Sequence, residues 1–243
     1  MPSFVWALVL IGVVGLPTVT AALLYRRAPK VAVGAVVVMA AWGVVSALLA
    51  ASGAYDQDAS AVKPWLGIAL VGVVAVLLAA ARIPAVRQAL AAPDTVARLV
   101  APQVLRVVGV MFLLVMALGQ LPAVFALPAG LGDMAVGIAA PFIARRLRNG
   151  STRGAVWFNV MGIVDLVVAV SIGYLAATGP TQLIHVTPST EAVTMLPLVL
   201  IPTVAVPLAL ALHVLSLLRL RSTRESHVAQ GRQTGPSPDP VAR

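Results

Sequence analysis

Long runs of apolar residues recur along the chain, and they constrain its fold more than any other feature. Seven such segments occur, at about residues 3–25, 31–53, 65–81, 103–121, 122–143, 155–177 and 196–218. A run of about 18 or more apolar residues is typical of a membrane-spanning helix, because about 20 helical residues cross the hydrocarbon core of a bilayer. The sequence therefore predicts an all-α membrane protein, a bundle of seven transmembrane helices in a single domain, residues 1–221, surrounded by the lipid bilayer.

Composition excludes several other classes of protein. The 243 residues are 60% hydrophobic and 10% charged, and the net charge of +9 lies mainly at the ends of the apolar runs. Basic residues in that position orient a membrane protein, so we expect no nucleic-acid partner. The chain has no cysteine, which excludes a disulfide, a thiolate nucleophile and a zinc–thiolate or iron–sulfur site. We predict no metal site and no cofactor.

Basic residues also predict the orientation of the chain. All of them except Lys63 fall in four regions, which follow the first, third and fifth spans and include the C-terminal tail. The positive-inside rule then places the N-terminus outside and the C-terminus in the cytoplasm. Arginine far outnumbers lysine, which is typical of proteins from GC-rich bacterial genomes. We therefore expect a multi-pass protein of the bacterial cytoplasmic (inner) membrane.

Two segments do not read as spans. Residues 83–100 are amphipathic, with Ile83, Val86 and Leu90 on one helical face, and we expect this segment to lie along the cytoplasmic interface. Residues 222–243 are polar and rich in glycine and proline, so they cannot bury enough apolar area to fold alone. The sequence predicts a disordered cytoplasmic tail there.

Two aspartates lie deep inside predicted spans and are the leading candidates for function. A carboxylate at the centre of a membrane helix costs at least about 2.5 kcal/mol to insert, so acids persist there mainly where they have a role. Asp133 and Asp165 lie at similar depths in the fifth and sixth spans, which a short loop joins as antiparallel neighbours. We expect the two carboxylates to face each other and to share a proton. The alternative is that each is a structural anchor bonded to a nearby polar group.

Prolines and one histidine in the last span suggest a path that leads to these acids. The prolines are Pro197, Pro202 and Pro207. Each removes a helix hydrogen bond, so the span should be kinked, and interrupted spans often line cavities in transporters. His213 lies below them and, with Asn159, is a candidate proton relay. The simpler alternatives are a kinked structural helix and a histidine bonded to a backbone carbonyl.

Arg106 and the glycines near the aspartates are candidate supporting residues. Arg106 lies near the cytoplasmic end of the fourth span, where we expect its side chain to snorkel to the interface, with an ion pair to Asp165 as the alternative. Gly130 and Gly132 precede Asp133 on its helix. Small residues of this kind usually allow helices to pack closely in a membrane.

Two resemblances rest on these motifs. Gly130-Leu131-Gly132-Asp133 resembles the GxGD motif of intramembrane aspartyl proteases, which implies that Asp133 and Asp165 activate water for peptide hydrolysis. In those proteases the GxGD aspartate comes second in the chain, whereas here it comes first. Residues 121–218 as a whole resemble a family of uncharacterised bacterial multi-pass proteins. That resemblance implies no particular activity.

Three functional hypotheses follow from the sequence. The first is a proton-linked permease for a small molecule or ion, with the aspartate pair carrying the proton. The second is an intramembrane aspartyl protease, so the sequence alone leaves open whether the chain is an enzyme. The third is a non-catalytic assembly or sensing subunit that acts with an oligomeric or membrane-protein partner.

Overall fold

The computed structural model describes the backbone of residues 1–233 and the side chains of residues 1–222. Within these residues the chain forms helices and no strand. In chain order the elements are α1 (Ser3–Tyr25), α2 (Pro29–Ala51), α3 (Trp65–Ala80), α4 (Pro84–Leu90), α5 (Thr95–Val100), η1 (Ala101–Gly109), α6 (Val110–Ala117), α7 (Ala123–Arg148), α8 (Ala155–Leu175), η2 (Glu191–Thr194), η3 (Ile201–Ala205) and α9 (Val206–Gln233). Of the short elements, η1 and η2 are 3₁₀-helices, and η3 is a π-helix.

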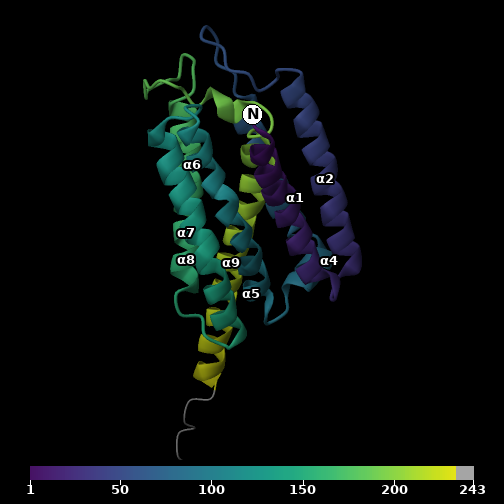
Figure 1. The fold of residues 1–243 in the computed structure, drawn as a ribbon. Coiled ribbons are helices and arrows are strands. Elements are labelled where there is room, and N and C mark those ends of the chain that lie inside the picture. The colour runs from purple at the N-terminus through teal and green to yellow at the C-terminus, as the bar shows by residue number, and fades with distance from the viewer. Residues whose placement is uncertain (234–243) are drawn as a thin grey trace, which may run out of the picture.

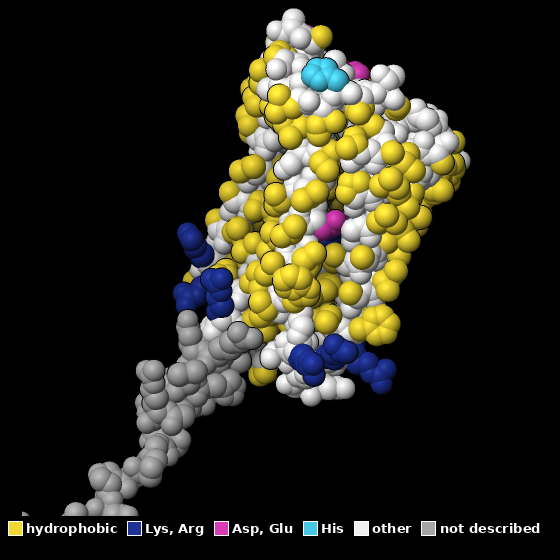
Figure 2. All heavy atoms as spheres, turned by 90° about the vertical axis from the view of Figure 1, so that its left-hand side faces the viewer, with side chains coloured by type: hydrophobic (Ala, Val, Ile, Leu, Met, Phe, Trp, Pro, Cys, Tyr) yellow, Lys and Arg dark blue, Asp and Glu magenta, His cyan; other side chains and the backbone are white. Residues whose placement is uncertain are grey.

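The long helices lie side by side in one bundle with two distinct ends (Figure 1). One end carries the α1–α2 and α7–α8 connections, and we call it the basic end because of the arginines there. The other end carries the connection between α2 and α3 that contains Lys63, and we call it the Lys63 end. Figure 2 shows Lys and Arg side chains gathered at the basic end and a largely hydrophobic surface along the middle of the bundle.

The apolar helices are long enough for a multi-pass membrane protein. Among the described residues, six segments are long and apolar enough to cross a bilayer, and Thr95–Ala117 is one of them although it passes through α5, η1 and α6. At 16 residues, α3 falls short alone, and it bends by 82° into α4. If this bent pair forms one span, the number of spans becomes seven.

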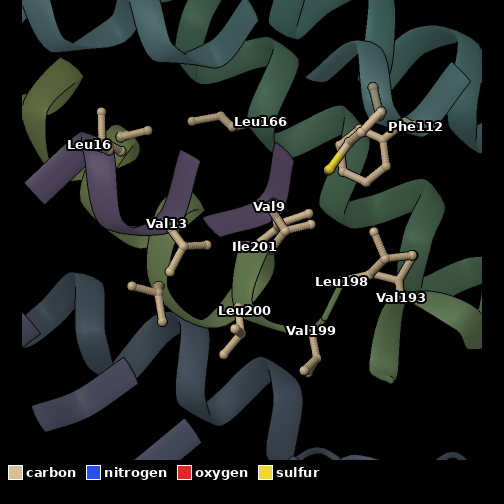
Figure 3. Close-up of a cluster of buried hydrophobic side chains, with 14 of the residues drawn as sticks. Val9, Val13, Leu16, Phe112, Leu166, Val193, Leu198, Val199, Leu200 and Ile201 are labelled. Carbon is tan, nitrogen blue, oxygen red and sulfur yellow. The ribbon is translucent and has the colours of Figure 1, made fainter. Parts of the chain in front are cut away.

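The buried core gathers around the last span. In the most apolar stretch of Ile201–Ser222, 56% of the residues are buried within the bundle, whereas in that of α2 only 17% are, so α2 lies at the periphery. Figure 3 shows how side chains of α1, such as Val9 and Val13, meet Leu166 of α8 and Ile201 of η3 in one apolar cluster. Since lipid is as apolar as these side chains, close packing is the main contribution that holds such helices together.

The segment 83–100 differs from the interfacial helix expected from the sequence. Within this segment, α4 turns away from α3, as an interfacial helix would. The second half, α5, is the beginning of the fourth span and not part of an interfacial helix. The reason is that Val96, Leu99 and Val100 are buried, and α5 packs against α7 and α9 rather than against a membrane surface. The span accordingly begins before residue 103 and ends at Ala117.

A charged cluster holds the start of α5 against the end of α1. Asp94 pairs with Arg98 at 2.7 Å and with Arg27 at 3.1 Å, and Arg98 also donates to the Leu23 carbonyl. Burial raises the pKa of Asp94, but the hydrogen bond and charge of Arg98, together with the charge of Arg27, outweigh it and hold this pKa below 3.8. A basic group at the carboxyl end of α1 also complements the helix dipole.

The last span is irregular at its start, as its prolines predict. Pro197 precedes the regular helix, Pro202 lies within η3, and Pro207 follows in α9. A π-helical turn is a common way to accommodate the hydrogen bonds that proline removes. Helix α9 then continues to Gln233, into the segment for which the sequence predicts disorder, and residues 234–243 lie outside the described part.

Candidate functional site

One arginine binds both candidate aspartates at mid-depth in the bundle. The Arg106 side chain is 5% exposed, and its Nε donates to Asp133 Oδ1 at 2.7 Å. Its Nη2 donates to Asp165 Oδ2. The planar guanidinium suits this role because its N–H groups point in fixed, diverging directions. Arg106 therefore does not snorkel to the interface, and the alternative of an ion pair with Asp165 holds.

The third nitrogen of Arg106 extends the network to the last span. Nη1 lies 3.1 Å from His213 Nε2 and 3.4 Å from the Gly162 carbonyl. Arginine nitrogens only donate, so His213 Nε2 is the acceptor and the ring is neutral. Its Nδ1 therefore carries the hydrogen and donates to Asn159 Oδ1 at 2.9 Å, while Asn159 Nδ2 donates to the Ala155 carbonyl at 2.7 Å. In this state His213 supports the arginine and carries no extra proton.

The sequence predicts that the two carboxylates share a proton, but within the described part of the chain no hydrogen bond joins them. Both bind the same guanidinium, and their side chains remain 16% and 15% exposed. Two ionised carboxylates, one guanidinium and a neutral imidazole sum to one negative charge. We call Asp133, Arg106 and Asp165 the charged triad. One bound proton makes it neutral.

Glycines determine how closely the triad residues approach. A Cβ on Gly132 of α7 would overlap the Asp165 carboxylate, and a Cβ on Gly109 of η1 would overlap the Asp133 side chain. A Cβ on Gly162 would overlap the His213 ring. These positions need a hydrogen in place of a side chain because polar side chains from neighbouring helices occupy the space. Gly130, by contrast, lies against Leu113 and serves helix packing.

Short connections place the triad at one depth. Helices α7 and α8 are joined by a turn in which Gly150 and Gly154 both have φ of 80°, a left-handed conformation that favours glycine. This tight turn makes the two helices antiparallel neighbours, so Asp133 and Asp165 lie level with each other. Arg106 reaches them because η1 packs extensively against α7.

Besides a small cavity of about 40 Å³ against α1, which is lined by Arg106 and Asp133, two larger openings lead to the triad from different sides. A cavity of about 90 Å³ reaches Asp133 from the Lys63 end, and residues along it include Gln57, Thr190 and Pro202. A separate groove of about 520 Å³ lies between α7 and α8, and Asp165 is among the residues that line it. Pro202 therefore lines a path, as the sequence predicts, whereas Pro207 is buried and lines neither opening.

A second polar contact was not anticipated from the sequence. Thr203 of η3 accepts a hydrogen bond from Ser46 Oγ at 2.7 Å, and its backbone carbonyl accepts one from Trp42 Nε1 at 2.8 Å. Gln103 is also fully buried and donates to the Ala209 carbonyl at 3.0 Å. The available signal was spacing: Trp42 and Ser46 lie four residues apart on one helical face, and Gln103 and Arg106 lie three apart.

The fold and site together define a helical bundle of the multi-pass type with a charged triad in which Arg106 is buried and both aspartates are half-buried. Residues 63–221 match a family described as a domain of unknown function (DUF8737). This match covers more than half of the chain, so the chain belongs to that family. The match includes the whole triad with His213 and Asn159, and it leaves out α1 and α2. No curated protein and no solved structure matches the chain.

Proposed function

We propose that the chain is a proton-linked permease for a small molecule or ion in the bacterial inner membrane. In this proposal α3 is a short span that brings the total to seven, and the Lys63 end faces outward. The charged triad binds and releases the coupling proton. The observation that carries the proposal is the cavity from the Lys63 end that reaches Asp133, since it brings the triad within reach of one side of the membrane.

The balance of charge supports a proton at this site. Inside a bilayer an ion pair is tolerated, but a net charge is costly. The triad with both carboxylates ionised carries one negative charge, so it gains stability from one proton or one other monovalent cation. In coupled transport, a binding site faces the two sides of the membrane in turn. If it must hold one cation or the other to change sides, the movement of one cation is linked to that of the other.

The arrangement gives less support to an aspartyl protease. That chemistry needs two carboxylates that share a proton and activate one water between them. Here the Arg106 guanidinium bonds both carboxylates and occupies the position of that water. In an assembly or sensing subunit, the triad would be an anchor between helices. That hypothesis predicts no proton movement, so a measurement of proton movement separates it from the permease.

The test is proton movement in liposomes that contain the full chain. A pH gradient is imposed, a pH-sensitive dye is trapped inside, and sodium, choline, alanine or tetraphenylphosphonium is added outside. We expect at least one of these four compounds to dissipate the gradient faster than in empty liposomes. Asp133→Asn and Asp165→Asn should each reduce that rate to the background level, because in each variant the triad has lost the excess negative charge that binds the proton.

A matched control is Asp56→Asn, which changes an exposed acid at the Lys63 end. It should transport as the wild type does. A rate that is the same with and without protein for all four compounds would contradict the permease and favour the anchor.

A further inference from the structure

The groove between α7 and α8 opens sideways, toward the lipid. Its lining is apolar apart from Asp165, and it includes Val164, Val168 and Trp157, all on the outer surface of α8. Figure 2 shows acidic atoms, with basic atoms next to them, at mid-height on an otherwise hydrophobic face. Among the residues that the structure describes, Asp165 is the only ionisable one that lines this groove.

Asp165 presents a free acceptor to this groove. Its Oδ2 binds Arg106, whereas among the described residues no donor bonds its Oδ1. Arg106 itself does not line the groove. A molecule that enters from the bilayer therefore meets the carboxylate before it meets the guanidinium.

Charge and shape together determine which molecule fits. The triad has one negative charge in excess, so the complementary ligand has one positive charge. The apolar walls supply no oxygen ligands for a hydrated metal ion, but they match an apolar body. Trp157 is 69% exposed at the groove, and an aromatic face of this kind attracts an organic cation.

We propose that this groove is a binding site for a lipophilic monovalent cation, such as an organic ammonium or phosphonium ion, with Asp165 as its counter-ion. The inference rests on the proposed function and names its substrate class. The cation reaches Asp165 from the lipid while protons reach Asp133 from the Lys63 end. Both neutralise the same excess charge, so binding of one releases the other.

The experiment measures binding of tetraphenylphosphonium to the purified full chain in detergent by calorimetry. We expect Asp165→Asn to weaken binding at least tenfold, because the cation loses its counter-ion. Binding by the wild type should release a proton in weakly buffered solution. It should also weaken as the pH falls, by about tenfold per pH unit where the proton is bound, since linkage between two competing ligands is reciprocal.

A pair of variants tests the groove while leaving the triad intact. Val164 and Val167 lie on α8 with similar exposure, 46% and 51%, but only Val164 lines the groove. Val164→Trp should fill the groove and weaken binding at least tenfold, whereas Val167→Trp should bind as the wild type does.

Equal binding by the two tryptophan variants, or by Asp165→Asn and the wild type, would overturn the lateral site. The permease proposal fails separately. If sodium or alanine moves protons in liposomes in an aspartate-dependent way while tetraphenylphosphonium does not bind, the permease stands and this substrate class is wrong.

Discussion

At the scale of single residues, each member of the charged triad depends on the others. Removing one partner from a buried ion pair costs about 3–5 kcal/mol, because the remaining charge is left uncompensated in an apolar medium. Arg106 has two such partners and a neutral acceptor, His213, and every one of its nitrogens has a bond. Loss of Arg106 would therefore leave both carboxylates without their positive partner.

The first structural prediction concerns shape at Gly132. Gly132→Ala adds a methyl group where the Asp165 carboxylate lies, so α7 and α8 must separate or the ion pair must shift. Overpacking of this kind typically costs about 1–3 kcal/mol. We expect a lower thermal unfolding midpoint in detergent, followed by tryptophan fluorescence. Gly72→Ala is the control, since a Cβ there meets nothing within 4 Å. Equal midpoints for both variants would show that the space at Gly132 is not needed.

At the scale of elements, the irregular helices lie where polar contacts cross the bundle. The 3₁₀-helix η1 carries Arg106 and Gln103, and the π-helix η3 carries Thr203. Short 3₁₀ and π segments within a span are often associated with function, since they redirect side chains and leave backbone groups available to partners. Helix α2, which contacts the bundle through few helices, is held to η3 by Trp42 and Ser46.

A double-mutant cycle tests this attachment of α2. Ser46→Ala and Thr203→Val each remove the side-chain hydrogen bond, so their combined effect should be less than the sum of the single effects. Such bonds inside membranes contribute about 0.6 kcal/mol on average and about 1.7 kcal/mol at most, and we expect a coupling energy in this range from unfolding in detergent. Thr18→Val paired with Ser46→Ala is the control, because Thr18 bonds only within its own helix. A coupling of zero for Ser46 and Thr203 would contradict the bond.

At the scale of the whole molecule, the two ends differ in charge. The basic end carries the arginines of the α1–α2 and α7–α8 connections, while Lys63 lies at the opposite end. Arg106, although basic, is buried between helices and contributes nothing to orientation. The positive-inside rule, applied to the loops alone, predicts that the Lys63 end faces outside.

Labelling of single cysteines tests this orientation, and the absence of native cysteines removes background. Ser60 is exposed near Lys63, and Ser151 is exposed between α7 and α8. In intact bacterial cells, an impermeant maleimide should label Ser60→Cys and leave Ser151→Cys unlabelled. Both should react after the cells are opened, which controls for access. Labelling of Ser151→Cys alone in intact cells would reverse the proposed orientation.

The sequence by itself determined the class of protein and the approximate position of its long helices. Length and apolarity are local properties, so the segments 3–25, 122–143 and 155–177 could be read as helices without knowledge of their neighbours. The same holds for the irregular start of the last span, since proline acts on its own turn. The sequence also singled out Asp133 and Asp165, because a carboxylate in an apolar run is unusual wherever the run packs.

Only the tertiary structure decided which polar groups meet. Arg106 lies 27 residues from Asp133, 59 from Asp165 and 107 from His213, and no local pattern specifies contacts across such separations. They depend on how each helix is rotated about its axis and on where η1 packs against α7. For the same reason the sequence favoured snorkelling for Arg106 and an interfacial position for α5: both follow from hydropathy along the chain, whereas burial depends on the helices that surround them.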